Sequence, residues 1–186
     1  MKGPQMQQIL NVYDGAAARL SRQDWLLATL ARLVFAAVLA VYFLNSGVTK
    51  LGDGAIGLLT PSAGAYIQIF PHAFANAGYD TSALGLFHHA VVIAGIAAEF
   101  LLPVLIMVGL FTRFAALGMI GFVALQSATD VFGHGQYDAL GRWFDRIPDA
   151  AILDQRALWL LLLVTLLIKG AGPLSLDKLL VMMRRR

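Results

Sequence analysis

Four long apolar runs dominate the pattern of hydrophobic and polar positions along the chain. Three are continuous, at residues 26–48, 86–110 and 114–132. The fourth, at 157–168, is short, and residues 150–153 extend it across the polar triplet 154–156. A helix needs about 20 apolar residues to cross a bilayer. The pattern predicts an all-α integral membrane four-helix bundle with spans at about 22–50, 84–109, 112–132 and 150–169.

Residues at the ends of these runs predict where the helices begin and end. Ser21 and Asp24 fit a capping box that opens the first span. Gly109 is a predicted C-cap and Thr112 the next N-cap, so a tight hairpin joins spans two and three. Pro103 lies inside span two and predicts a bend, because proline clashes with the carbonyl four residues earlier.

The segments outside the spans predict further helical structure. Met6, Ile9, Tyr13, Ala16 and Leu20 recur at helical spacing, so residues 1–21 are interpreted as an interfacial amphipathic helix. A loosely ordered tail is the alternative. Two apolar outer loops, 52–84 and 133–149, are expected to contain short helical pieces, and 173–186 is expected to be a cytoplasmic tail. Residues 1–186 are interpreted as a single membrane domain.

Composition and charge support a membrane location. Of the 186 residues 59% are hydrophobic and 13% are charged, against about 25% charged in soluble domains. Ten of the 14 lysines and arginines lie on the side of the two termini and four on the other. The positive-inside rule then places both termini in the cytoplasm, N-in and C-in, across a bacterial inner membrane. The basic residues sit at helix ends rather than on one polar face, so no nucleic-acid partner is expected.

Glu99 is the most informative polar residue, because it lies near the middle of span two. Ionisable groups inside a bilayer are costly and need a reason. Pro103 would leave the Glu99 carbonyl free, so a buried carboxyl and a backbone acceptor fall at one place. One reading makes Glu99 a catalytic proton acceptor. The other makes it the partner of a basic residue, most obviously Arg32, that fixes helix packing.

Further polar side chains gather toward the outer ends of the spans. We predict that they form the mouth of an outward-opening substrate pocket with Glu99 at its floor. The candidate substrate-binding residues are Asn45, Lys50, His88, Gln126 and Asp130, with Asp154 nearby. The alternative is ordinary interfacial residues, particularly for Lys50 and Asp154.

Metal and thiol chemistry are not expected. The chain has no cysteine, which excludes disulfides and thiolate ligands contributed by it. Its four histidines show no recognised ligand spacing, so they are expected to hydrogen-bond loop carbonyls rather than to hold a metal or haem.

Several short strings together resemble the DoxX family of small four-helix inner-membrane proteins. They are 47–51 (GVTKL), Glu99, 109–113 (GLFTR) and 170–177 (GAGPLSLD), and the resemblance covers roughly residues 26–180. The chain departs from the family pattern in its N-terminal extension and long outer loops.

The resemblance implies a function only broadly. Relatives are linked to a thiosulfate:quinone oxidoreductase or act as accessory subunits of membrane redox complexes. It implies a membrane subunit of an oxidoreductase that binds a quinone-like or small reduced substrate, with a protein partner on the periplasmic side or in the membrane. The alternative is a non-catalytic anchor or assembly factor for a periplasmic or inner-membrane complex. No residue here can carry electrons, so a redox role needs a partner chain or a bound cofactor.

Overall fold

Four long helical segments form the body of the protein. The computed structural model describes residues 4–54 and 56–184, and this part of the chain contains helices and turns but no strands. The four segments have 27, 23, 22 and 19 residues and are long and apolar enough to cross a membrane. The chain is therefore a multi-pass membrane protein. In order, the segments are α2 (Asp24–Val34), η1 (Phe35–Ala40) and α3 (Val41–Lys50); α6 (Leu86–Val108); α7 (Thr112–Ala128) and η3 (Thr129–Gly133); and η5 (Ala151–Gln155) and α8 (Arg156–Lys169).

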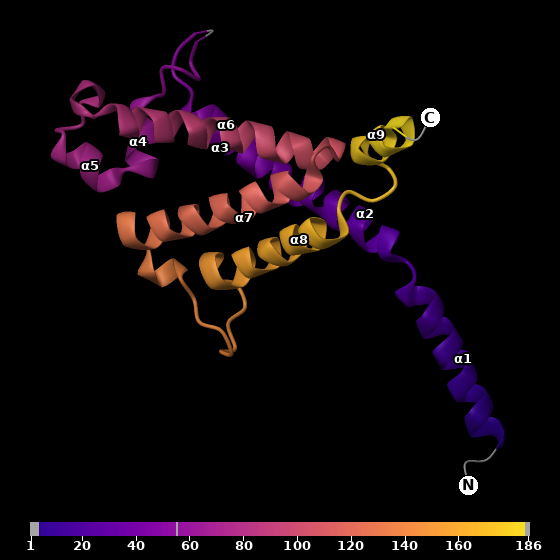
Figure 1. The fold of residues 1–186 in the computed structure, drawn as a ribbon. Helices are drawn as coiled ribbons and strands as arrows, with labels where there is room; N and C mark the ends of the chain where they lie inside the picture. Colours follow the sequence, from indigo (N-terminus) through magenta and orange to yellow (C-terminus); the bar gives the residue numbers. More distant parts are fainter. Residues whose placement is uncertain (1–3, 55, 185–186) are drawn as a thin grey trace.

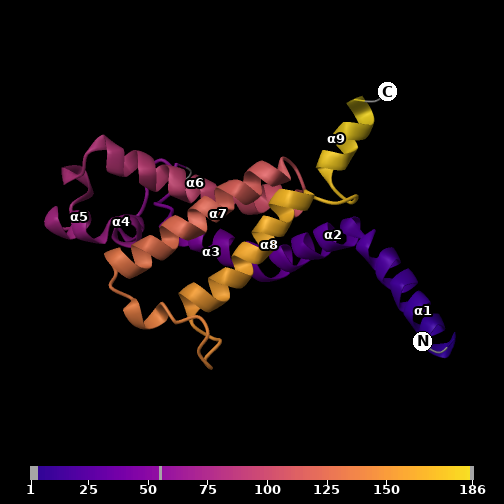
Figure 2. The ribbon, with the colours of Figure 1, turned by 60° about the horizontal axis from the view of Figure 1, so that its bottom comes forward.

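The spans pack as an antiparallel bundle. Helix α7 lies between α6 and α8, while α3 packs on α6 and α2 packs on α8 (Figures 1 and 2). Helices α1 and α9 both leave the bundle at the same end, which we call the termini end. There Lys169 Nζ donates to Asp24 Oδ1 at 2.8 Å. We call the opposite end, with the two long loops, the loop end.

Two hydrophobic cores lie along the bundle. The first joins all four spans in the half toward the termini end and includes Phe35, Phe43, Met119, Leu163 and Leu166. The second lies at the loop end, where the short helices of the first long loop cover α6. It includes Tyr66, Phe74, Val92 and Ile96. Along α6, Glu99 falls between the residues of the two cores.

Both long loops contain short helices, as predicted. The first holds α4 (Ala63–Ile69), α5 (Pro71–Asn76) and η2 (Thr81–Ala83), and the second holds η4 (Tyr137–Ala139). Two imidazoles tie the first loop to η3. His134 Nε2 lies 3.0 Å from the Gln68 carbonyl oxygen and His72 Nε2 lies 3.3 Å from that of Phe132. His134 therefore bonds a loop carbonyl, as the sequence predicted, whereas the carbonyl bonded by His72 belongs to the end of the third span.

The predicted capping box at the first span is wrong. Ser21 ends α1 (Pro4–Ser21), where its hydroxyl donates to the Ala18 carbonyl at 3.1 Å. The residue before α2 is Gln23, which makes no capping bond with its side chain. Hydroxyl groups can bond backward to their own helix as well as forward to the next one, and the backward bond prevails here.

The turn between α6 and α7 matches one prediction and corrects another. Gly109 ends α6 with φ 69°, as predicted for a C-cap. Thr112, however, is the first residue of α7, and Phe111 precedes it with φ 47°. The cap comes from Asp177, whose Oδ1 and Oδ2 accept the Phe111 and Thr112 N–H groups at 2.7 and 3.0 Å.

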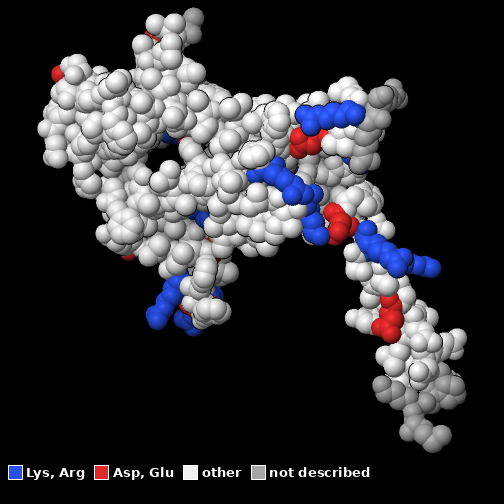
Figure 3. All heavy atoms as spheres, viewed as in Figure 1, with Lys and Arg blue, Asp and Glu red and all other residues white. Residues whose placement is uncertain are grey.

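The two terminal helices lie outside the bundle. Helix α1 is exposed along its length and extends away from the spans, and α9 (Leu176–Arg184) follows the last span (Figures 1 and 2). Residues 1–3 of the predicted amphipathic segment and 185–186 of the predicted tail lie outside the described residues. In Figure 3 most charged atoms gather near the two ends, with a largely uncharged band between them.

Candidate functional site

A buried ion pair joins α3 to α6. Lys50 Nζ donates to Glu99 Oε1 at 2.8 Å and to Oε2 at 3.0 Å. The Ser46 hydroxyl accepts from Lys50 at 2.7 Å and donates to Glu99 Oε1 at 2.9 Å. Lys50 and Glu99 are only 5% and 3% exposed. We call these three residues the α3–α6 cluster, and its charged atoms all have hydrogen-bond partners.

Local sequence explains why these groups meet. Ser46 and Lys50 are four residues apart and share a helix face. Helical side chains point back toward the N-terminus, so Lys50 reaches back one turn to the level of Ser46. Gly47 lets α6 come close, because a Cβ there would lie 2.9 Å from the Phe100 ring.

Arg32 is not the partner that the sequence suggested for Glu99. Its guanidinium donates to the Ala171 carbonyl at 2.9 Å and also to that of Leu174. Arg32 therefore holds the chain after the last span at the termini end, while Lys50 approaches Glu99 from the other end. The pairing itself matches the packing alternative considered for Glu99.

A second polar cluster joins α3, α7, η3 and α8. Arg156 donates to Asp130 Oδ2 at 2.5 Å through Nη2 and to the Ser127 hydroxyl at 2.9 Å through Nη1. Gln126 Nε2 donates to the Tyr42 hydroxyl at 2.9 Å. The Trp159 ring lies between, with its centroid 5.9 Å from Arg156 Cζ and 5.4 Å from the Tyr42 centroid. We call these residues the α7–α8 cluster: Tyr42, Gln126, Ser127, Asp130, Arg156 and Trp159.

Two buried atoms of the α7–α8 cluster lack partners. Gln126 Oε1 and Arg156 Nε are both inaccessible and have no hydrogen bond within the described residues. One is an acceptor and the other is a donor. An unpaired buried polar group costs about 1–3 kcal/mol, and more when it is charged. The hydrogen bonds of this cluster are therefore incomplete within the described residues, unlike those of the α3–α6 cluster.

The structure does not bring the predicted pocket residues together in one site. Glu99 and Lys50 are together, and Gln126 and Asp130 are together in the other cluster. Asn45 is exposed and belongs to neither cluster. His88 packs its ring 4.9 Å from that of Phe70, beneath the first long loop, with Nδ1 buried and unpartnered.

Asp154 forms a hydrogen bond at the start of the fourth span. Its Oδ2 accepts from the Ala150 N–H at 3.0 Å, so it closes the start of this span, in keeping with the interfacial alternative.

The two clusters are neighbours along span one. Tyr42 and Ser46 are four residues apart, a separation of about 6 Å along a helix axis. Sequence reasoning missed Tyr42, Ser46, Arg156 and Trp159. Two spacings in the sequence indicate these residues. Tyr42, Ser46 and Lys50 recur every four residues, and Arg156 and Trp159 are three residues apart. Each spacing places the side chains on one face of a helix.

A tyrosine hydroxyl at the loop end connects the first long loop to α6. The Tyr66 hydroxyl lies 2.6 Å from His89 Nδ1. Burial raises the pKa of the Tyr66 hydroxyl, because desolvation disfavours the phenolate. The Tyr66 hydroxyl therefore stays protonated, and its contact with His89 links α4 to α6.

Comparison with known proteins gives the family. The DoxX family model matches residues 27–135, which is more than half of the chain and takes in the first three spans. The chain belongs to the DoxX family. The match includes both residues of the Lys50–Glu99 pair, while Arg156 and Trp159 lie beyond it. No curated protein and no solved structure matches this DoxX protein significantly.

Proposed function

We propose that this DoxX protein is a membrane subunit of a redox system and that its α7–α8 cluster binds the head group of a quinone-like molecule. The observation that carries the proposal is the pair of buried, unpartnered atoms Gln126 Oε1 and Arg156 Nε beside the Tyr42 and Trp159 rings. We further propose that the protein lies in a bacterial inner membrane with both termini in the cytoplasm, from its charge distribution.

The reduced form of such a molecule has the chemistry that the cluster lacks. A hydroquinone hydroxyl can donate to Gln126 Oε1, and a hydroquinone oxygen can accept from Arg156 Nε. Its ring can pack on the aromatic faces of Trp159 and Tyr42. The oxidised quinone has no hydroxyl and leaves Gln126 Oε1 without a donor. A site built to bond a hydroxyl discriminates strongly against an analogue that lacks it, so the hydroquinone is the preferred ligand.

Glu99 is the proposed proton acceptor, because Ser46, which bonds it, lies one helical turn from Tyr42 of the ligand site. Oxidation of a hydroquinone releases two protons and two electrons; a carboxylate near the head group can take up one proton, and the second passes to solvent. The contacts with Lys50 and Ser46 fix the position of the Glu99 carboxyl group between α3 and α6. The same contacts also stabilise the packing of α3 on α6. A substitution of Glu99 must therefore be tested for its effect on electron transfer separately from its effect on helix packing.

The electrons require a second component. The chain has no cysteine, so thiol redox chemistry must come from elsewhere. We propose that a partner chain at the loop end, or within the membrane, carries the electron acceptor.

Electron transfer by the isolated complex tests the proposal. The complex would be purified through the tagged wild-type chain and through Gln126→Leu, Glu99→Gln and Gln136→Leu variants, and its oxidation of a soluble hydroquinone analogue would be measured. Gln136 is an exposed residue of the second long loop and serves as the matched control. We expect Gln126→Leu to lose activity and Gln136→Leu to keep it. Full activity in Glu99→Gln would remove Glu99 from the mechanism.

A specific surface favours the second candidate function, a non-catalytic anchor or assembly factor. The tip of the second long loop exposes Trp143, Phe144 and Ile147, which are next to Arg142 and Arg146 in the sequence. Phe144 is fully exposed, with φ 63°. Large exposed apolar groups often mark docking surfaces. If no variant affects electron transfer but Phe144→Ser releases a co-purified partner, the assembly role is the correct one.

A further inference from the structure

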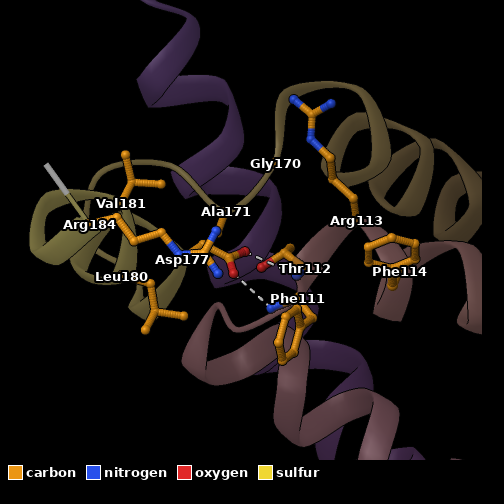
Figure 4. Close-up of a pocket in the computed structure, with 10 residues that line it drawn as sticks. All are labelled: Phe111, Thr112, Arg113, Phe114, Gly170, Ala171, Asp177, Leu180, Val181 and Arg184. Carbon is orange, nitrogen blue, oxygen red and sulfur yellow. Dashed lines mark hydrogen bonds between the residues drawn. The ribbon is translucent and has the colours of Figure 1, made fainter.

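A pocket of about 330 Å³ opens at the termini end, whereas the two clusters lie within the spans toward the loop end. It lies between the α6–α7 turn, the segment after α8 and helix α9 (Figure 4). Phe111, Thr112, Arg113 and Phe114 line it from the turn and the start of α7, and Asp177 and Arg184 line it from α9. Nothing in the proposed redox role uses this pocket.

The pocket carries net positive charge. Arg113 lies beside Gly170 and Arg184 lies on α9, on different sides of the pocket (Figure 4). Within the described residues neither arginine forms an ion pair. The carboxylate of Asp177 already accepts two backbone N–H groups. Two lining arginines against one carboxylate favour an anion.

A buried hydroxyl in the lining has no hydrogen-bond partner of its own. Thr112 is fully buried, and its Oγ1 has no hydrogen-bond partner within residues 4–54 and 56–184. The backbone N–H of Thr112 is already bonded to Asp177. A hydroxyl can donate to a phosphate oxygen, which would remove the cost of leaving it unpaired.

The rest of the lining is apolar and continues onto the outer surface of the spans. Phe111 and Phe114 are 58% and 77% exposed, and Leu180 and Val181 border the same pocket. A free inorganic phosphate has no apolar part that could contact such a surface. A phospholipid can contact both parts of the lining, because its acyl chains can pack on the exposed phenylalanines while its phosphate binds the arginines.

We propose that this pocket binds the phosphate of an anionic phospholipid, held by Arg113, Arg184 and the Thr112 hydroxyl. Basic pockets between membrane helices are known to recognise anionic head groups. The bound phosphate would bridge Arg184 on α9 and Arg113 at the start of α7, and so stabilise the contact between α9 and the α6–α7 turn. This proposal does not depend on the redox role or on the hydroquinone ligand.

Retention of lipid by the full-length protein tests the proposal. The wild type would be reconstituted in bilayer discs of phosphatidylcholine with one-fifth phosphatidylglycerol, and bound lipid would be counted by native mass spectrometry after release into detergent. We expect one retained phosphatidylglycerol. The double variant Arg113→Gln/Arg184→Gln should bind it more weakly by about five-fold for each arginine. The double variant Arg142→Gln/Arg146→Gln removes the same charge at the loop end and should retain it.

Two further measurements decide between the lipid and its alternatives. Thr112→Val keeps all charges and should lower phosphatidylglycerol retention several-fold, whereas a hydroxyl without a ligand would leave retention unchanged. Added inorganic phosphate should not displace the lipid. Equal retention by the two arginine double variants, unchanged retention in Thr112→Val, or displacement by inorganic phosphate would each overturn the proposal.

Discussion

The two buried ion pairs differ in how completely their hydrogen bonds are satisfied. In the α3–α6 cluster, Lys50, Glu99 and Ser46 bond one another at 2.7–3.0 Å. In the α7–α8 cluster, Arg156 and Gln126 each keep a buried atom without a partner. Both clusters lie toward the loop end of the spans and are only about one helical turn apart along α3.

This difference distinguishes a cluster that holds helices together from one that we propose binds a ligand. A buried ion pair whose groups are all bonded can hold helices in register without any ligand. The incompletely bonded cluster beside aromatic rings is the one in which we propose that a ligand completes the hydrogen bonds. Buried charge alone therefore does not locate a binding site in a membrane bundle, and the unpartnered atoms are the better guide.

The largest expected effect comes from breaking the α3–α6 pair. Lys50→Met leaves the Glu99 carboxylate buried and unpaired, which should lower the free energy of unfolding by about 3–5 kcal/mol. Unfolding in detergent by increasing denaturant would measure it. The double variant Lys50→Met/Glu99→Leu should regain most of the loss, because it replaces the pair by apolar groups. A double variant no more stable than Lys50→Met would show that the charge is not the cause.

Breaking the α7–α8 pair should cost less. Arg156→Met leaves Asp130, whose side chain is 21% exposed against 4% for Glu99, so solvent can partly replace the lost partner. We expect a loss of about 1.5–3 kcal/mol, typical of one hydrogen bond to a charged group. The same unfolding assay compares the two single variants directly. A larger loss in Arg156→Met than in Lys50→Met would reverse the comparison.

The close contact of α3 with α6 can be tested without changing charge. A Cβ on Gly47 would lie 2.9 Å from the Phe100 ring, so Gly47→Ala should cost about 1–3 kcal/mol through overpacking. Gly121→Ala is the matched control, since nothing lies within 4 Å of the Cβ it would add. That control should be neutral or gain up to about 1 kcal/mol from helix propensity. Equal effects of the two substitutions would mean that Gly47 is not needed for the helix contact.

The smallest expected effect has the opposite sign. Gln126→Leu removes an unpartnered buried acceptor together with one bond to Tyr42, so the ligand-free protein should change by less than about 1 kcal/mol and toward greater stability. A thermal melt of the purified variant measures it. A large loss of stability would show that Gln126 is already fully used within the bundle and would argue against the ligand site.

The sequence predicted the spans well because membrane helices carry a strong local signal. It also identified Glu99 as a buried charge and Gly109 as the end of α6. It misplaced the partner of Glu99, because position along a span does not show that a lysine side chain reaches back one turn. The Asp177 cap on α7 joins residues 65 and 66 positions apart, and no local pattern reveals such a contact. Arg156 was overlooked because a polar triplet at the start of a span resembles an ordinary interface.

Binding of a soluble hydroquinone analogue to the purified protein tests the central claim most directly. The shift in melting temperature would be measured for the wild type and for Gln126→Leu, Glu99→Gln and Gln136→Leu. The account predicts that the hydroquinone stabilises the wild type, Glu99→Gln and Gln136→Leu but not Gln126→Leu, and that the oxidised quinone stabilises the wild type less. No shift in the wild type, or an equal shift in Gln126→Leu, would contradict it.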